Sequence, residues 1–320
     1  MPALDPQVEN LLELGRKAGS KPYEALTPDE ARAAYAAAKD VLQPPAEDVA
    51  QVRDVSVPTK NGELRLRVYR GIGTQADELL PCLVFLHGGG WVIGNLDSHD
   101  GLCRRLANKA RICVVAVDYR LAPEHRFPAA LDDSAAALQW VSDNVAMLGI
   151  APGRIAIGGD SAGGNLAAVL ALMGRDGTAP RTMYQALIYP VVDLTASSDS
   201  YARVTSGLPL TAATMHYFID HYTPTASDRL DWRASPCKAE SLAGTPPALV
   251  MTVAHDPLCD EGRAYARRLE DDGVRVTSLH LSDHMHGMVM HGKLVHASNV
   301  IVDYIGAAIG DALHRGIPTL

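Results

Sequence analysis

The stretch Gly159-Asp160-Ser161-Ala162-Gly163 decides the fold that this sequence predicts. It follows an apolar run of strand length, residues 155–157, and precedes a helix-like segment, residues 165–173. The small residues at both ends of a Gly-x-Ser-x-Gly sequence let a strand turn sharply into a helix, so that the central side chain projects from the strand end. We therefore predict that Ser161 is a nucleophile. The pattern also occurs by chance, so the rest of the chain must support it.

Apolar runs of strand length and helix-like segments alternate outside this turn. The other strand-like runs are residues 83–86, 112–117, 184–189, 248–253 and 274–281. The helix-like segments are residues 101–110, 128–145, 261–272 and 293–313. An antiparallel hairpin is expected before them, because apolar residues alternate on either side of Asn61-Gly62, a strong turn signal. The sequence thus predicts an α/β fold with a mostly parallel sheet of about eight strands and helices on both faces.

The remaining segments predict a helical cap over this core. Thr27-Pro28-Asp29-Glu30 is a capping box that opens a helix to Leu42, and an earlier helix carries an apolar stripe of Val8, Leu11, Leu12 and Leu14. Residues 194–225 interrupt the alternation and are interpreted as an insertion. We expect four segments: an N-terminal helical part of the cap (1–45), the first part of the core (46–193), the cap insertion (194–225) and the second part of the core (226–320).

Composition excludes several classes of protein. The 320 residues are 47% hydrophobic, which is enough for a sizeable core, and the net charge of -8 argues against a nucleic-acid surface. Residues 1–7 lack a basic stretch followed by an apolar one, and no run approaches the roughly 20 apolar residues of a membrane span. We expect a soluble, cytoplasmic protein. Its five scattered cysteines, without a C-x-x-C pair, favour reduced thiols over disulfides or a zinc site.

A glycine run follows the first parallel strand. Ligands of such sheets gather at the carboxyl ends of the strands, and residues 83–86 are followed there by His87-Gly88-Gly89-Gly90-Trp91. Without side chains, the N–H groups of Gly88, Gly89 and Gly90 can approach an anionic centre. With the N–H of Ala162 they predict an oxyanion hole, in which one donor can be worth roughly 3 kcal/mol of the barrier. The alternatives are a plain tight turn and, less favoured because no Gly-Lys-Ser/Thr follows, a phosphate loop.

A serine hydroxyl needs a base to take its proton, and a neutral histidine suits that task near pH 7. We predict His286, on the segment 282–287 that follows the last strand. His284 is the competing choice, whereas His280 falls within the strand pattern and is expected to be a packed or edge residue.

The acid that orients the base should follow another strand end. Asp256 lies just after residues 248–253. Asp260 and Glu261 are its rivals, although a carboxylate at the start of a predicted helix is already explained by the helix dipole. The chain order Ser161, Asp256, His286 is that of the α/β-hydrolases.

Several motifs together resemble the bacterial hormone-sensitive-lipase family of carboxylesterases, in its Gly-Asp-Ser-Ala-Gly branch. Besides the glycine run and the serine turn, the motifs are Asp118-Tyr119-Arg120-Leu121-Ala122-Pro123-Glu124, Tyr189-Pro190 and Asp256-Pro257-Leu258. The resemblance spans nearly the whole chain. It implies a cap made of the N-terminal helices and the insertion after Pro190, short- to medium-chain ester substrates and no cofactor. Met288 stands where the family often has an aromatic residue, a departure that concerns packing near the base.

Other residues of these motifs receive structural roles. Asp160 is expected to bond locally to its turn, with substrate contact as the less favoured role. Arg120 and Glu124 are predicted to form an ion pair that pins their loop beneath the glycine run. Trp91 and Leu208 are candidates for pocket lining or, equally, for core or cap packing.

Other patterns in the sequence bear on four alternative functions and on assembly. A metal cluster among Asp283, His284, His286, His291 and His296 is disfavoured, because no His-Glu-x-x-His register is present. Dinucleotide binding is disfavoured because the G-x-G-x-x-G pattern is absent. A receptor on the same fold, like the plant gibberellin receptors that lack the base, is disfavoured by His286. Acyl transfer or amide hydrolysis by the same residues remains open. The edge strand at 274–281 favours a homodimer.

Overall fold

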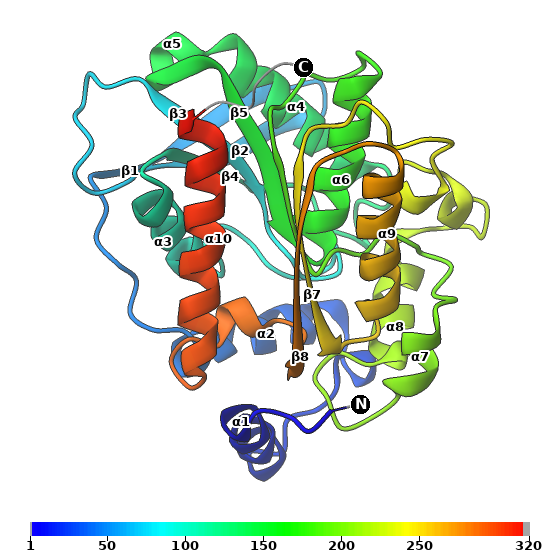
Figure 1. Ribbon diagram of the computed structural model, residues 1–320. Helices are drawn as coiled ribbons and strands as arrows, with labels where there is room; N and C mark the ends of the chain where they lie inside the picture. Colours follow the sequence, from blue (N-terminus) through cyan, green and yellow to red (C-terminus); the bar gives the residue numbers. More distant parts are fainter. Residues whose placement is uncertain (1, 316–320) are drawn as a thin grey trace.

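The computed structural model of the protein describes residues 2–315 (Figure 1). Residue 1 and residues 316–320, at the ends of the expected segments 1–45 and 226–320, lie outside the described residues. In the described part of the chain, eight strands form one sheet in the order β1-β2-β4-β3-β5-β6-β7-β8. The mostly parallel sheet of about eight strands that the sequence predicts is confirmed.

The first two strands form the predicted hairpin. They are β1 (Gln51–Thr59) and β2 (Gly62–Arg70), and Thr59 pairs with Gly62, so the two turn residues are Lys60 and Asn61. β2 then runs antiparallel to β4. The parallel strands are β3 (Leu80–Leu86), β4 (Cys113–Val117), β5 (Ile150–Asp160), β6 (Gln185–Ile188), β7 (Ala248–His255) and β8 (Val276–Met285). Their carboxyl ends therefore lie along one edge of the sheet.

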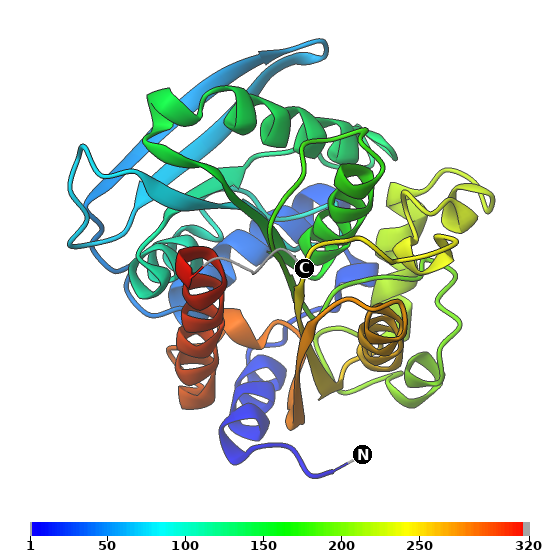
Figure 2. The same cartoon turned by 45° about the horizontal axis from the view of Figure 1, so that its top comes forward.

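Helices bury both faces of the sheet (Figures 1 and 2). Successive side chains of a strand point to opposite faces. On β3, Val84 and Leu86 belong to one buried cluster and Leu83 and Phe85 to another. The first cluster includes α4 (Ala129–Asp143), α6 (Ala162–Arg175) and α9 (Cys259–Asp271), and the second includes α3 (Asp100–Ala110) and α10 (His296–Arg315). The short α5 (Val145–Leu148) leads into β5.

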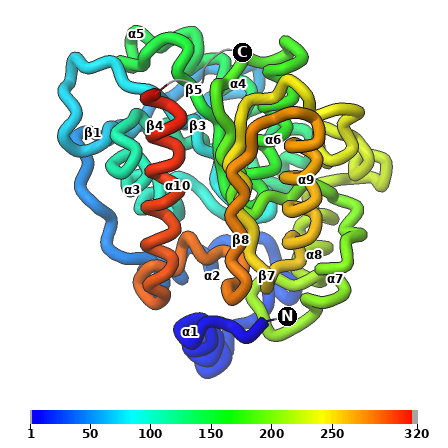
Figure 3. The backbone as a smooth tube through the Cα atoms, viewed as in Figure 1, coloured from blue at the N-terminus to red at the C-terminus, as the bar shows by residue number. Residues whose placement is uncertain are grey.

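The N-terminal helices and the insertion lie together beyond the carboxyl ends of β7 and β8. The backbone tube in Figure 3 shows the same arrangement. They are α1 (Pro6–Lys17), η1 (Tyr23–Ala25), α2 (Pro28–Leu42), α7 (Asp199–Arg203) and α8 (Ala212–Tyr222). The predicted capping box opens α2, with Thr27 N–H donating to Glu30 at 2.8 Å. The two segments touch, because the rings of Tyr23 and Phe218 lie 5.8 Å apart and Thr214 donates to Glu24 at 2.7 Å.

Single helical turns complete the list of elements. They are η2 (Asp228–Leu230), η3 (Pro236–Lys238) and η4 (Met288–Met290).

On α1 the apolar stripe is narrower than predicted, because Val8 is buried whereas Leu14 is 53% exposed. No helix within residues 2–315 has both the length and the apolar character that crossing a membrane requires.

The last strand is longer than the sequence predicts. We expected residues 282–287 to leave the sheet, but β8 continues to Met285. After a register shift, Met285 pairs with His255 of β7, and this pairing keeps the extended chain in the sheet. His284 therefore lies within the strand, and His286 is the first residue beyond it.

The predicted ion pair between Arg120 and Glu124 is wrong. Arg120 instead binds both oxygens of Asp133 on α4, each at 2.8 Å. Glu124 binds Arg32 of α2, at 2.8 and 2.6 Å. The two residues are close in sequence, but helices from different parts of the chain supply better-placed partners. The loop is still held near the glycine run, since Ala122 N–H donates to the carbonyl of Trp91 at 2.8 Å.

Candidate active site

Ser161 occupies the sharp turn that the sequence predicts. It lies between the end of β5 and the start of α6 at Ala162, and its φ of 54° and ψ of -118° are unusual for a residue with a side chain. A Cβ atom at Gly159 or Gly163 would collide with the carbonyl oxygen of Leu86. The turn therefore packs directly against the end of β3, and this close approach requires glycine at both positions.

Three side chains from three strand ends form one chain of hydrogen bonds. His286 Nε2 lies 2.9 Å from Ser161 Oγ, and His286 Nδ1 lies 2.7 Å from Asp256 Oδ2. The carboxylate can only accept, so Nδ1 carries the proton and Nε2 is free to accept from the serine hydroxyl. Asp256 is fully buried and also accepts from Leu258 N–H at 2.9 Å. This is the geometry in which a serine can be deprotonated.

The competing residues have other partners. His284 Nδ1 binds Asp283 at 2.7 Å, and His280 binds Thr252 at 2.9 Å, an edge position as predicted. Among the carboxylates, Asp260 binds Arg203, and Glu261 accepts from the N–H groups of Val192 and Asp193. None of these side chains reaches Ser161 or His286 through a hydrogen bond among the described residues.

The glycine run lies beside Ser161, but its amides are not equivalent. Gly88 N–H donates to Asp160 Oδ1 at 2.9 Å and so already has an acceptor. Within residues 2–315, the N–H groups of Gly89, Gly90 and Ala162 have no acceptor, which leaves them available to an anionic centre. Gly90 has a φ of 57°, and a Cβ atom there would overlap the ring of Phe218 on α8. The insertion thus packs directly on the run.

The expectation that Asp160 bonds within its own turn is wrong. Its buried carboxylate reaches Gly88, and it also lies 3.2 Å from His99 Nε2, just before α3. Burial alone would raise the pKa of Asp160, but His99 and the Gly88 N–H hold that pKa below its usual value. His99 is a site residue that sequence reasoning missed. It lies in no motif, and only the packing of α3 against the sheet brings it here.

His87, the first residue of the motif, has a structural role. Its Nδ1 lies 2.8 Å from the carbonyl of Gly88, and Tyr119 stacks on its ring with the centroids 4.2 Å apart. The Tyr119 hydroxyl donates to the His87 carbonyl at 2.6 Å. Burial, and then the neighbouring His99, lowers the pKa of His87 to about 4, so the ring is neutral near pH 7.

Trp91 and Leu208 turn out to be packing residues. Trp91 is fully buried, and its ring stacks on Tyr222 of α8 with the centroids 4.2 Å apart. Leu208 is partly buried in a small cluster with Val8 of α1 and Met285, next to His286. Met288, the departure from the family pattern, is buried against α10 and its neighbours. Both the N-terminal helix and the insertion therefore pack near His286.

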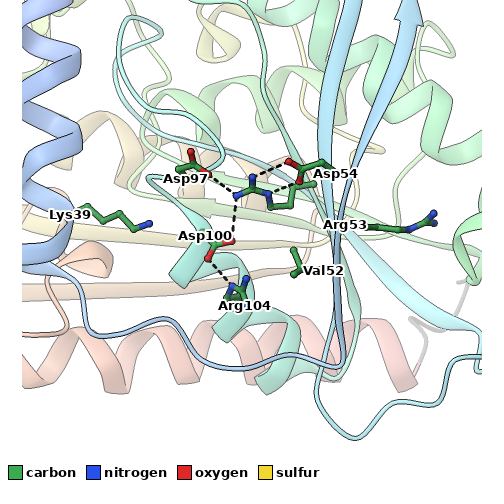
Figure 4. Close-up of a pocket in the computed structure, with 8 residues that line it drawn as sticks. Lys39, Val52, Arg53, Asp54, Asp97, Asp100 and Arg104 are labelled. Carbon is green, nitrogen blue, oxygen red and sulfur yellow. Dashed lines mark hydrogen bonds and ion pairs between the residues drawn. The ribbon is translucent and has the colours of Figure 1, made fainter.

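A separate pocket of about 420 Å³ lies between α2, β1, β2 and α3 (Figure 4). Its lining residues are Lys39, Val52, Arg53, Asp54, Arg67, Asp97, Asp100 and Arg104, and none of them belongs to the chain of hydrogen bonds around Ser161. Its charges largely satisfy one another: Arg67 binds Asp54 at 2.6 Å and Asp97 at 2.8 Å, and Arg104 binds Asp100 at 2.7 Å. We assign no ligand to it.

The fold and this site define a class of enzyme. A strand–serine–helix turn, followed along the chain by an acid and a histidine at later strand ends, is the arrangement of the α/β-hydrolases. Residues 83–290 match the model of the α/β hydrolase fold family. The chain belongs to the α/β-hydrolase family.

Individual relatives are ester hydrolases by name. The chain is 40% identical to an ethyl acetate hydrolase of Pseudomonas putida, over 89% of this chain and 91% of that protein. It is also 40% identical to the carboxylic ester hydrolase LipN of Mycobacterium tuberculosis, over 89% and 77%. An α/β hydrolase from the metagenome of Lake Arreo, Spain, has 40% identity and a TM-score of 0.92 over 98% of this chain and 99% of that one. A hyperthermophilic esterase of Pyrobaculum calidifontis has 39% identity and a TM-score of 0.90 over 97% and 99%.

Proposed function

We propose that this α/β hydrolase is a serine carboxylesterase that hydrolyses short- to medium-chain carboxylic esters. The observation that carries this proposal is the continuous chain Asp256–His286–Ser161, with contacts of 2.7 and 2.9 Å, beside N–H groups that have no acceptor in residues 2–315. The names of the relatives, among them ethyl acetate hydrolase, support esters as the substrate class.

The reaction begins with acylation of the serine. His286 Nε2 takes the proton of Ser161 Oγ as the oxygen attacks the ester carbonyl. Asp256 holds the imidazole in the required tautomer and stabilises its cation. Negative charge develops on the former carbonyl oxygen, and the N–H groups of Gly89, Gly90 and Ala162 are the donors available to it. The C–O bond to the alcohol then breaks, the leaving oxygen takes the proton from His286, and an acyl-enzyme remains.

Deacylation repeats the same steps with water. His286 takes a proton from a water molecule, whose oxygen attacks the acyl carbon bound to Ser161. The second tetrahedral intermediate uses the same donors. When it collapses, the proton returns to Ser161 Oγ and the carboxylic acid is released. No step requires a cofactor.

The finer assignments also belong to this proposal. The four segments 1–45, 46–193, 194–225 and 226–320 are interpreted as cap, core, cap and core. Contacts of α1 near His286 and of α8 on Gly90 support a cap over the site. We assign the chain to the hormone-sensitive-lipase branch from its motifs. We also propose a cytoplasmic location, which its five free cysteines support.

We further propose a homodimer formed through the edge strand around residues 274–281. β8 pairs only with β7 among the described strands, so its outer edge is open to a second copy. Light scattering should give twice the mass of one chain. A mass of one chain at micromolar concentration would reject the dimer.

The central experiment compares the protein with Ser161→Ala. The unchanged protein should hydrolyse p-nitrophenyl esters with short acyl chains and should be labelled by a fluorophosphonate, which reports an activated serine. Ser161→Ala should lose both properties while keeping its circular dichroism spectrum. An acyl-chain series then defines the preferred length. Undiminished activity in the variant would refute the assignment, and absence of labelling in the unchanged protein would favour a receptor-like binding function.

A further inference from the structure

The loop that follows β6 is tied to the serine turn by two backbone hydrogen bonds. Ser161 N–H donates to the carbonyl of Ile188 at 2.9 Å, and Val191 N–H donates to the carbonyl of Ser161 at 3.3 Å. Between them, Tyr189 N–H donates to the carbonyl of Met251 on β7 at 2.7 Å. A side chain on this loop is therefore held at a set position relative to the nucleophile.

Tyr189 has a backbone conformation that a bulky residue rarely adopts. Its φ is 35°, in the left-handed region that favours glycine, and its side chain is nevertheless large and fully buried. Strain of this kind persists only where the surrounding structure holds it, and it gathers at functional sites. A different φ would turn the Cα–Cβ bond, so the strained backbone sets the direction of the Tyr189 ring.

The Tyr189 ring packs against the imidazole of His286. The two ring centroids lie 4.5 Å apart, and the ring planes are inclined at 51° to one another. The tyrosine hydroxyl is buried and has no hydrogen-bond partner within residues 2–315. The contact with His286 is therefore made by the aromatic ring, and no hydrogen bond of the hydroxyl is needed to orient it.

An aromatic ring beside His286 matters most when the imidazole is charged. Proton transfer from Ser161 turns the imidazole into a cation, and Asp256 is the one ionisable acid among its hydrogen-bond partners in residues 2–315. The buried His291 is neutral near pH 7, because burial and then the nearby His286 lower its pKa to about 4. An aromatic face attracts a cation within about 6 Å of the ring centroid, and the Tyr189 ring lies within that reach.

We propose that Tyr189 is a positioning residue for the base: its ring holds the His286 imidazole towards Ser161 and stabilises the imidazolium that forms during acylation and deacylation. Tyr189 acts through His286 and takes no proton itself. The loop supplies the physical link, since its backbone is bound to the serine turn and its side chain packs on the base. This inference rests on the proposed esterase function.

Two variants of Tyr189 separate the ring from the hydroxyl. Tyr189→Phe keeps the ring and removes a hydroxyl that has no partner, so kcat should stay within about threefold of the unchanged protein. Tyr189→Leu removes the ring but stays apolar. Its kcat should fall at least about tenfold with KM changed by less than about threefold, because the imidazolium exists only once proton transfer begins. All three side chains must adopt the same φ, so the strain cancels in the comparison.

Tyr184→Leu is the matched control for the loss of a buried tyrosine. Tyr184 precedes β6 at its amino end, away from the site, and belongs to the same buried cluster as Tyr189. Its removal should destabilise the protein as Tyr189→Leu does, because both leave a cavity in the core. The control should nevertheless keep kcat within about threefold of the unchanged protein.

The pH dependence of kcat/KM gives a readout that loss of packing alone would not move in this direction. Without the ring the imidazolium is less favoured. The pH of half-maximal kcat/KM on the acid side should therefore be lower in Tyr189→Leu by about half a unit or more. It should stay in place in Tyr189→Phe and in Tyr184→Leu.

Three kinetic outcomes would overturn the proposal. They are a kcat of folded Tyr189→Leu within about threefold of the unchanged protein, a Phe variant as impaired as the Leu variant, and an acid-side half-maximum that does not move in Tyr189→Leu. If the Leu variant does not fold, Tyr189→Met is judged by the same limits, because methionine also lacks a ring and adapts to irregular space.

The rate of labelling by a fluorophosphonate tests the same role without an ester substrate. The probe reports activation of Ser161 by the base, so Tyr189→Leu should be labelled at least about tenfold more slowly than the unchanged protein, and Tyr189→Phe at a similar rate. Equal rates in all three proteins, beside normal ester hydrolysis, would overturn the role of Tyr189 and leave the proposed function standing. Slower labelling of the Leu variant in a protein that hydrolyses no ester would refute the proposed function and support the role of Tyr189. An unchanged protein that is neither labelled nor active would refute both.

Discussion

Arg203 on α7 donates to both carboxylate oxygens of Asp260, at 2.8 and 2.7 Å. The same helix carries Ser200, whose hydroxyl donates to the Pro257 carbonyl at 2.5 Å and accepts from Asp260 N–H at 3.2 Å. These contacts attach the insertion to the loop that begins with Asp256. The position of the proposed acid therefore depends on a helix from a separate part of the chain.

Ser200→Ala should destabilise the protein more than Arg203→Gln does. Ser200 is fully buried, and its loss would leave two backbone groups without partners, at a cost of about 1–3 kcal/mol. The Arg203 side chain is 43% exposed, and its ion pair is worth about 0–1 kcal/mol. Urea unfolding of both variants measures the difference. The interpretation of α7 as an anchor fails if Arg203→Gln is the more costly change.

His286→Ala should abolish turnover, whereas His284→Ala should not. Only His286 contacts both Ser161 and Asp256, while His284 is bound to Asp283. We expect kcat to fall by about 10⁴ or more for the first variant, and by less than about threefold for the second. Initial rates on a p-nitrophenyl ester distinguish them. An inactive His284→Ala beside an active His286→Ala would reverse the assignment of the base.

Glu261→Gln should become relatively more stable as pH rises. Burial raises the pKa of Glu261 well above its usual value, against the opposing N–H bonds of Val192 and Asp193. The unfolded chain therefore loses this proton near pH 4.3, before the folded protein does, and stability falls as pH rises from there towards the folded pKa. Glutamine keeps an acceptor oxygen and removes the titration. Urea unfolding from about pH 4.5 to 7.5 should give a difference that grows in favour of glutamine, and a constant difference would contradict the raised pKa.

Gly90→Ala and Phe218→Ala should not be additive. Alanine at position 90 would have to adopt a φ of 57° and would overlap the Phe218 ring. The backbone strain costs roughly 1–2 kcal/mol whatever the neighbour, whereas the overlap disappears when the ring is removed. The double variant should therefore lose less stability than the sum of the single variants, as a double-mutant cycle measures. Additive losses would mean that the ring does not limit this position.

Local sequence predicts what depends on near neighbours. The capping box at Thr27, the hairpin and the turn at Ser161 each need a short pattern, and the structure has all three. The sequence places the end of β8 several residues before Met285, where the strand ends in the structure. Met285 is kept in the sheet by its pairing with His255 and not by its own sequence. The Arg120–Glu124 pair failed for a related reason, since Asp133 and Arg32 come from distant helices.

The sequence by itself determined that Ser161 lies on a strand–helix turn and that Asp256 and His286 follow later strand ends, because parallel strands bring their carboxyl ends to one edge. Only the tertiary structure decided which groups around Ser161 are free to act. Asp160 takes the N–H of Gly88, and His99, from a loop that no motif marks, lies 3.2 Å from that carboxylate. A motif specifies backbone shape over a few residues, whereas a hydrogen-bond partner or a compensating charge is chosen by whatever side chain the packed fold places within about 3 Å. The glycine run is thus a property of the sequence, and which of its N–H groups are left without an acceptor in residues 2–315 is a property of the fold.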